Sequence, residues 1–147
     1  MKRLFLFLLA LLLLAGCKAE PTIVDLGGKP VTYGSTEEMA EAAELIVTGK
    51  VLSCDSRIER LLGDQVTSAV TLSEIEIITV EKGEVYPGDV IKIWQDSAFD
   101  AENNTIYQFG SADPLMDGEE YLLYLRPRQS GSEYYTPVSF QGILPNP

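Results

Sequence analysis

The chain has 147 residues, with 22 acidic and 11 basic side chains, no histidine and two cysteines. The lack of histidine removes the commonest general base, the Ser-His-Asp and Cys-His nucleophile systems and most zinc sites. The excess of negative charge repels the phosphate backbone of nucleic acids, so nucleic-acid binding is disfavoured.

The chain begins with a segment that is typical of an export signal. Met1-Lys2-Arg3 is followed by an unbroken apolar run, Leu4 to Ala15. A short positive start, an apolar core of about a dozen residues and small residues before a cleavage point predict a secretory signal peptide. The run is too short for a membrane-spanning helix, which needs about 20 apolar residues.

The signal ends in Leu14-Ala15-Gly16-Cys17, which resembles the bacterial lipobox. The resemblance implies cleavage between Gly16 and Cys17 and a diacylglyceryl group on the Cys17 sulfur. We therefore expect a lipoprotein that is anchored on the extracytoplasmic face of a cell membrane, or of an outer membrane if there is one. Residues 1–16 would be the signal peptide, 17–34 the lipidated N-terminus and tether, and 35–147 a single domain.

Residues 18–34 contain two prolines and three glycines and are expected to be a spacer. Thr22-Ile23-Val24 is the only extended candidate in this stretch. The alternative is that these residues add an edge strand to the domain. Both interpretations stay open.

The next segment predicts a helix that starts at Ser35. Ser35 and Glu38 fit the capping box, in which the two side chains satisfy backbone N–H groups at the start of a helix. The residues that share one helical face are Met39, Ala42, Ala43 and Ile46. The acidic residues on the other side are interpreted as a solvated face rather than a cation site.

A strand follows directly at Leu45–Val51, and Gly49 in its middle indicates a tight bend or a close backbone approach. Residues 53–64 are polar and are expected to be a loop or a frayed hairpin. Val66–Glu81 is a long run of residues that favour β-strands. Its apolar residues alternate as in a strand, but the side to which they point changes twice. Two bulges, near Ser73-Glu74 and near Ile77-Ile78, would produce these shifts.

Further strands are expected beyond a type II turn at Tyr86–Asp89. They are Val90–Gln95 with Ile91 and Ile93 inward, Thr105–Phe109, a central strand at 119–125, and an edge strand at 134–140 that contains Pro137. Residues 96–104 are expected to be irregular, and 141–147 to trail out. Five or six strands with one helix predict a mainly β fold, a small OB-like barrel with one N-terminal helix. A two-sheet sandwich is the alternative.

The helix that leads into residues 43–51, Ala-Glu-Leu-Ile-Val-Thr-Gly-Lys-Val, is similar to the opening of the netrin-like module. This module is the OB-type barrel shared with tissue inhibitors of metalloproteinases. Val80-Glu81-Lys82-Gly83 and residues 118–125 match it in position, so the resemblance covers roughly residues 36–144. It implies the barrel. Inhibition of metalloproteinases is not carried over, because the family's disulfides are missing and Cys17 would be held by lipid.

Small barrels of this type bind ligands on one open face, where aromatic rings stack on bases or sugars. The candidates for such a face are Trp94, Tyr107 and Tyr124, with Phe109, Tyr134 and Tyr135. The alternative is that most of these rings pack the core or cover its edges.

Two further features of the sequence are candidate sites. The oxygen-rich loop Asp96–Asn104 suits calcium in composition, but it has no EF-hand spacing and is interpreted as a solvated loop. Cys54 has no histidine to activate it and has Asp55 beside it, so a small buried hydrophobe or an unused thiol is expected.

The sequence therefore favours a non-catalytic binding module for an envelope protein, or for a glycan or small ligand. One alternative is an inhibitor or accessory subunit of a membrane enzyme or transporter. A second alternative is a small hydrolase that uses paired carboxylates. No catalytic residue, metal site or cofactor is predicted.

Overall fold

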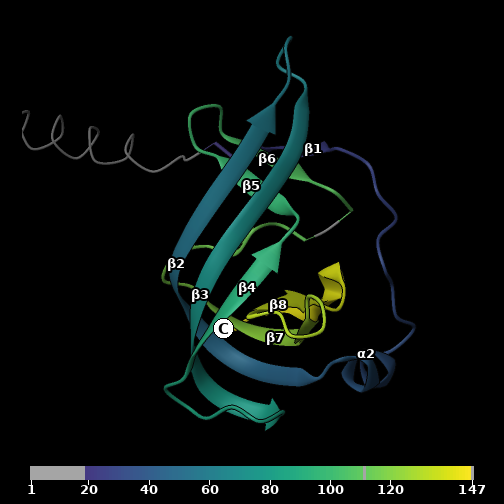
Figure 1. Cartoon of the computed structure of the whole chain (residues 1–147), viewed down its shortest axis with the longest axis vertical. Helices are drawn as coiled ribbons and strands as arrows, with labels where there is room; N and C mark the ends of the chain where they lie inside the picture. Colours follow the sequence, from purple (N-terminus) through teal and green to yellow (C-terminus); the bar gives the residue numbers. More distant parts are fainter. Residues whose placement is uncertain (1–18, 111, 147) are drawn as a thin grey trace, which may run out of the picture.

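The computed structural model describes residues 19–110 and 112–146. The predicted signal peptide and lipobox, including Gly16 and Cys17, lie outside the described residues. Within the described part, nine strands accompany one α-helix and one short 3₁₀ helix (Figure 1). No helix in this part is long and apolar enough to cross a membrane.

Five strands close into a ring. They are β2 (Leu45–Arg60), β3 (Val66–Lys82), β4 (Val90–Gln95), β7 (Glu120–Pro127) and β8 (Tyr134–Pro137). The order around the ring is β2-β3-β4-β8-β7 and back to β2, with only the β4–β8 pair parallel. A five-stranded Greek-key barrel is the OB architecture, so the predicted OB-like barrel with one N-terminal helix is confirmed.

A second, smaller sheet has the order β1-β6-β5. Its strands are β1 (Thr22–Asp25), β6 (Thr105–Gln108) and β5 (Ser97–Asp100), and β1 pairs with β6 in parallel. The alternative in which Ile23 and Val24 form an edge strand is therefore confirmed. The expectation of an irregular segment at 96–104 was wrong, because its first half is β5.

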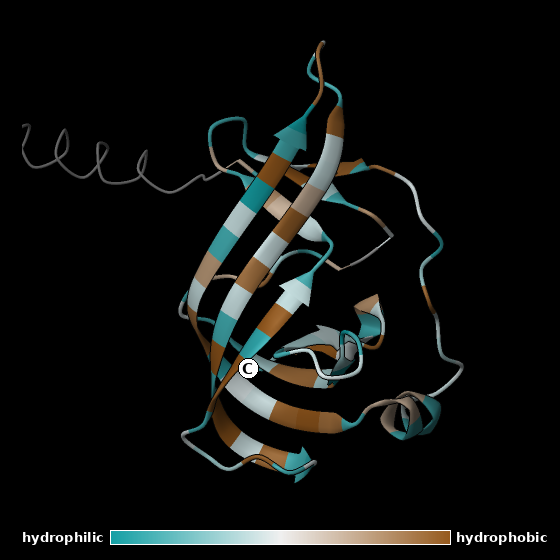
Figure 2. Cartoon of the chain, in the orientation of Figure 1, coloured by the Kyte–Doolittle hydropathy of each residue, from teal (hydrophilic) through white to brown (hydrophobic). Residues whose placement is uncertain are grey.

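The barrel interior is filled by apolar side chains from all its long strands. The fully or nearly fully buried members are Leu45, Val47, Val51, Ile75, Ile77, Ile91, Ile93, Leu115, Leu123 and Leu125. Figure 2 shows the matching alternation of apolar and polar residues along β2 and β3. The inward direction predicted for Ile91 and Ile93 is confirmed.

At Gly49, β3 lies so close to β2 that there is no room for a side chain. A Cβ atom on Gly49 would clash with Ile75 Cγ2 and would lie 3.1 Å from the Glu76 carbonyl oxygen. The predicted close approach of backbone at Gly49 is therefore confirmed, and no larger residue fits there without displacement of β3.

The β2–β3 hairpin extends well beyond the barrel, which is visible at the top of Figure 1. Of the two expectations for residues 53–64, the loop was wrong and the hairpin is confirmed, because the β2–β3 ladder continues to the pair Arg60–Val66. This part of β2 carries mostly exposed polar side chains, since it projects past the core and has no apolar face to bury. Only residues 61–65 form the turn.

Along β3, every second residue from Ala69 to Ile77 is buried and points into the barrel, with no interruption. The predicted bulge near Ser73-Glu74 on β3 was wrong, because Thr71 and Ser73 point inward although they are polar. The irregularity at this level lies on β2, where Leu52 is the extra residue. The second predicted bulge is confirmed, since Ile78 is skipped in the β2–β3 register.

The C-terminal segment completes the barrel instead of trailing away. After β8, a 3₁₀ helix η1 (Phe140–Gly142) leads into β9 (Ile143–Pro145), which pairs with β7 beside β8. Pro137 was expected on an edge strand, but β8 lies inside the ring between β4 and β7. The proline is tolerated because β4 pairs only with Tyr134 and Tyr135, so Pro137 lies beyond that ladder.

Helix α2 (Thr36–Ala42) covers β7 from outside the barrel. The predicted cap is confirmed, since Ser35 Oγ accepts a hydrogen bond from the Glu38 N–H. The helix and barrel share a second small core, formed by Met39, Ala43, Ile46, Tyr124 and Val138.

Candidate functional site

The three predicted ligand-face residues do not share a face. Tyr124 is only 6% exposed and packs under helix α2. Its inclusion in a ligand face was therefore wrong, because β7 turns this ring toward the helix. Tyr107 is on β6 in the small sheet, where its ring lies 5.7 Å from the guanidinium of Arg60. Trp94 is on the outer face of β4 and is half-buried.

Trp94 is the centre of a cluster of aromatic and cationic side chains. The guanidinium carbon of Arg128 lies 4.0 Å from its ring centre, which is within cation–π range. Tyr134 meets the ring edge-on, with centroids 6.0 Å apart. The Trp94 indole N–H donates to Asp96 Oδ1 at 3.0 Å and thereby fixes the ring orientation.

Lys92 extends this cluster along β4. Its ammonium lies 5.8 Å from the centre of the Tyr134 ring and 2.8 Å from a carboxylate oxygen of Glu133. The hydrogen bond with Glu133 is the main reason why the pKa of Lys92 is raised above its ordinary value. Both partners are substantially exposed, so the ion pair itself stabilises the fold little.

Next to Trp94 lies a hollow of about 300 Å³, called here the cationic hollow. Lys29, Arg126 and Arg128 line it together with Asp96. None of these three cations is within 4 Å of a carboxylate oxygen in the described part of the chain. In a chain with formal net charge −11 this is a local concentration of positive charge.

Sequence reasoning missed the cationic hollow. Lys29 was placed in the spacer, almost a hundred residues before Arg126. One signal was present, because Arg126-Pro127-Arg128 at the end of a strand places two arginines on the same side. The contribution of Lys29 depends on how residues 26–34 cross the barrel, which no local pattern specifies.

A second hollow, of about 1050 Å³, lies between the small sheet and the C-terminal segment of the barrel. Its lining is mostly apolar, and it is called here the apolar hollow. Its lining residues are Ala19, Glu20, Pro21, Phe99, Asn104, Ile106, Gln108, Ala112, Asp113, Pro114, Met116, Tyr121, Phe140, Ile143 and Pro145. Ala112, Phe140 and Ile143 line both hollows, which therefore adjoin.

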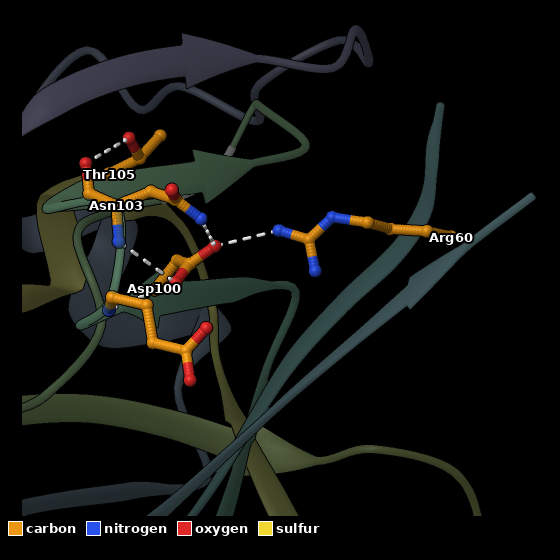
Figure 3. A network of polar contacts seen from close by, with 5 residues as sticks. Arg60, Asp100, Asn103 and Thr105 are labelled. Atoms are coloured by element: carbon orange, nitrogen blue, oxygen red, sulfur yellow. Dashed lines mark hydrogen bonds and ion pairs between the residues drawn. The ribbon is translucent and has the colours of Figure 1, made fainter. Parts of the chain in front are cut away.

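The oxygen-rich loop is organised by one carboxylate (Figure 3). Asp100 accepts hydrogen bonds from the backbone N–H groups of Glu102 and Asn103, from Asn103 Nδ2 at 2.8 Å, and from Arg60 at 2.7 Å. The bonds from Asn103 and Arg60 outweigh burial and hold the pKa of Asp100 below its ordinary value. Asp100 thus serves as the anchor of the β5–β6 turn. Among the described residues, no three His, Cys, Asp or Glu side chains are placed to hold a metal ion.

Cys54 lies half-buried on β2, against the polar part of the barrel interior. Its Sγ is 3.1 Å from the Leu115 carbonyl oxygen and 3.3 Å from Ser73 Oγ. Burial raises the pKa of the Cys54 thiol to about 11. The thiol is therefore protonated at neutral pH and a weak nucleophile.

No protein-family model matches this chain, and no curated protein matches it. The strand order defines the class of the protein as an OB-type barrel with an N-terminal helix and a small accessory sheet. Its site is defined by the two adjoining hollows and the Trp94 cluster.

Proposed function

We propose that this protein is a non-catalytic binding module, held by lipid on Cys17 at the extracytoplasmic face of a membrane, that takes an anionic envelope ligand in the cationic hollow. The observation that carries the proposal is the convergence of Lys29, Arg126 and Arg128 on one hollow of an acidic chain. An anion that reaches this hollow is attracted locally, while the rest of the surface repels it. This difference in charge would direct an anionic ligand to the hollow and would disfavour its binding elsewhere on the surface.

The geometry suits a carboxylate or phosphate group that is attached to a flat or ring-shaped moiety. An arginine fork binds such oxygens through two parallel hydrogen bonds. The Trp94 ring beside Arg128 supplies a surface on which a sugar or another ring can stack. OB barrels commonly bind ligands through an outer strand face and the neighbouring loops, and Trp94 and Arg128 occupy a face and a loop of this kind.

A titration that follows the emission of Trp94, which is the only tryptophan of the chain, tests the proposal. We expect anionic envelope glycans to change the emission and neutral glycans of similar size to leave it unchanged. The double variant Arg126→Ala/Arg128→Ala should bind at least about tenfold more weakly, since each lost charge-assisted bond contributes about 1.5–3 kcal/mol. The control Arg57→Ala/Lys50→Ala removes the same charge outside the hollow and should bind normally. Equal loss in both variants would contradict the proposal.

The lipid anchor has its own test. A Cys17→Ser variant should accumulate as a full-length precursor, because the residue that receives the lipid is lost. A normally trimmed, membrane-bound product would contradict the anchor.

A second candidate function, an accessory subunit of a membrane enzyme or transporter, is favoured by the tip of the β2–β3 hairpin. Leu62 is fully exposed there and Leu61 is 62% exposed, on a hairpin that projects beyond the barrel. Exposed leucines at a projecting tip can enter an apolar pocket of a neighbouring protein. Photo-crosslinking in cells from position 62, compared with position 86 on the β3–β4 turn, tests this function. A single dominant product from position 62 alone is expected, and equal products from both positions would contradict it.

A further inference from the structure

We infer that the cationic hollow and the apolar hollow form one site for an anionic amphiphile, a molecule with a carboxylate or phosphate head and an acyl-like tail. The inference rests on the proposed anion binding and names its ligand class. The head would bind Lys29, Arg126 and Arg128, and the tail would lie in the apolar hollow.

Contiguity of the two hollows is the first argument. Ala112, Phe140 and Ile143 belong to the walls of both, so the two hollows lie directly beside one another. The apolar hollow, at about 1050 Å³, has the size of sites that enclose a small organic ligand. The cationic hollow, at about 300 Å³, has room for a head group alone.

The chemistry of the apolar walls is the second argument. Phe99, Ile106, Tyr121 and Pro114 present carbon surface to the apolar hollow. Met116 and Phe140, also in its wall, remain 46% and 41% exposed, which is high for apolar side chains of their size. An acyl-like tail would remove this surface from water, and each methylene that it buries strengthens binding about fourfold.

The distribution of charge sets the orientation of the ligand. The carboxylates of Glu20 and Asp113 lie in the wall of the apolar hollow and repel an anionic head. The cationic hollow has three cations and one carboxylate, Asp96, which already accepts the Trp94 N–H. The head therefore binds beside Trp94 and the tail points toward the small sheet.

The neutral diacylglyceryl group proposed on Cys17 would be a competing occupant of the apolar hollow. Its attachment point lies two residues before Ala19, within about 7 Å of chain length from the rim of the apolar hollow. This group has no anionic head and makes no use of Arg126 or Arg128. The dependence of binding on those arginines separates the two occupants.

The test uses the lipidated protein, residues 17–147, with Trp94 emission and calorimetry as readouts, and each lipid probe is kept below the concentration at which it aggregates. The probes are oleate, lysophosphatidic acid, monoolein and inorganic phosphate. We expect oleate and lysophosphatidic acid to bind. Monoolein, which has no anionic head, and phosphate, which has no acyl tail, should bind at least tenfold more weakly. A preference between the first two distinguishes a fatty-acid carboxylate from a phospholipid head.

Two variants test the head-binding part and the tail-binding part of the site separately. Arg126→Ala/Arg128→Ala should weaken both anionic amphiphiles at least tenfold. Met116→Glu should also weaken them while it leaves the binding of soluble anionic glycans unchanged, since Met116 lines the apolar hollow and not the cationic hollow. Val90→Glu is the control, since Val90 is 52% exposed and lines neither hollow.

Several results would overturn the inference. If anionic glycans bind but oleate and lysophosphatidic acid do not, the amphiphile site fails and the proposed function stands. If no anion binds, both fail. Binding of monoolein as tight as that of oleate would show an apolar site without a head subsite. Tail binding that appears only in the Cys17→Ser variant would show that the protein's own lipid fills the apolar hollow.

Discussion

The guanidinium carbon of Arg128, a residue that lines the cationic hollow, lies 4.0 Å from the centre of the Trp94 ring. We expect Arg128→Ala to change the intensity and wavelength of Trp94 emission, because the ring loses its cover and gains water contact. The free energy of unfolding should fall by less than about 1 kcal/mol, as for other exposed cation–π pairs. Fluorescence and urea unfolding measure the two effects. Arg57→Ala, whose partner is Asp55, is the control, and an unchanged emission in Arg128→Ala would contradict the contact.

Gly49→Ala tests the close approach of β2 and β3. The new methyl group would meet Ile75 Cγ2 and the Glu76 carbonyl, and β2 cannot move away because it is also paired with β7. We expect the variant to lose about 1–3 kcal/mol of unfolding free energy, as overpacked cores do. Urea unfolding measures the loss. Lys50→Ala, one residue along but exposed, should stay within about 0.5 kcal/mol of the parent.

Asp100→Asn tests the anchor of the β5–β6 turn. The pKa of Asp100 is below its ordinary value in the folded protein, so its ionised form stabilises the fold above that ordinary value. This contribution is lost as the pH falls through the folded-state pKa. The stability gap between parent and variant should therefore be wide at pH 7 and narrow toward pH 3.

Urea midpoints measured across this pH range check the effect. Asp55→Asn is the matched control, since Asp55 also pairs with an arginine but its side chain is 59% exposed. A gap of constant width for Asp100→Asn would show that the carboxylate acts only through its shape.

Cys54 should be slow to react with thiol reagents. With a pKa raised from 9.0 to about 11, its thiolate fraction at pH 8 is roughly a hundredfold below that of an ordinary thiol, and alkylation should be correspondingly slow. In a Cys17→Ser variant Cys54 is the only thiol, so iodoacetamide labelling followed by mass spectrometry measures its rate directly. Labelling in urea gives the reference rate. Equal rates in the folded and unfolded protein would contradict the burial of Cys54.

The barrel could be predicted because its apolar inner positions alternate along the strands, as at Ile91 and Ile93. The failures occurred where the inner face is polar. Thr71 and Ser73 point inward, Thr71 because its hydroxyl donates to the Ser97 carbonyl and Ser73 because it meets Cys54. Alternation of hydrophobicity cannot identify an inward residue whose burial is compensated by a hydrogen bond.

The candidate site could be predicted only in part. Trp94 was identified from its residue type, and its exposure on β4 agrees with that choice. Tyr124 was not distinguished from it, because the helix that buries Tyr124 is packed by tertiary contacts rather than by local sequence. Lys29 and Phe140 come from segments expected to be spacer and strand end, and only the path of the chain across the barrel brings them beside Arg128.

The ring of the barrel is closed by β8, and only two residue pairs, Lys92–Tyr134 and Ile93–Tyr135, join β8 to β4. β8 is the last strand of the ring in chain order, and its partner β4 lies about forty residues earlier. A chain that crosses a membrane N-terminus first therefore cannot close the barrel until Tyr134 has emerged on the far side. If the chain is exported as proposed, this strand order would therefore delay the closure of the barrel until β8 has crossed the membrane.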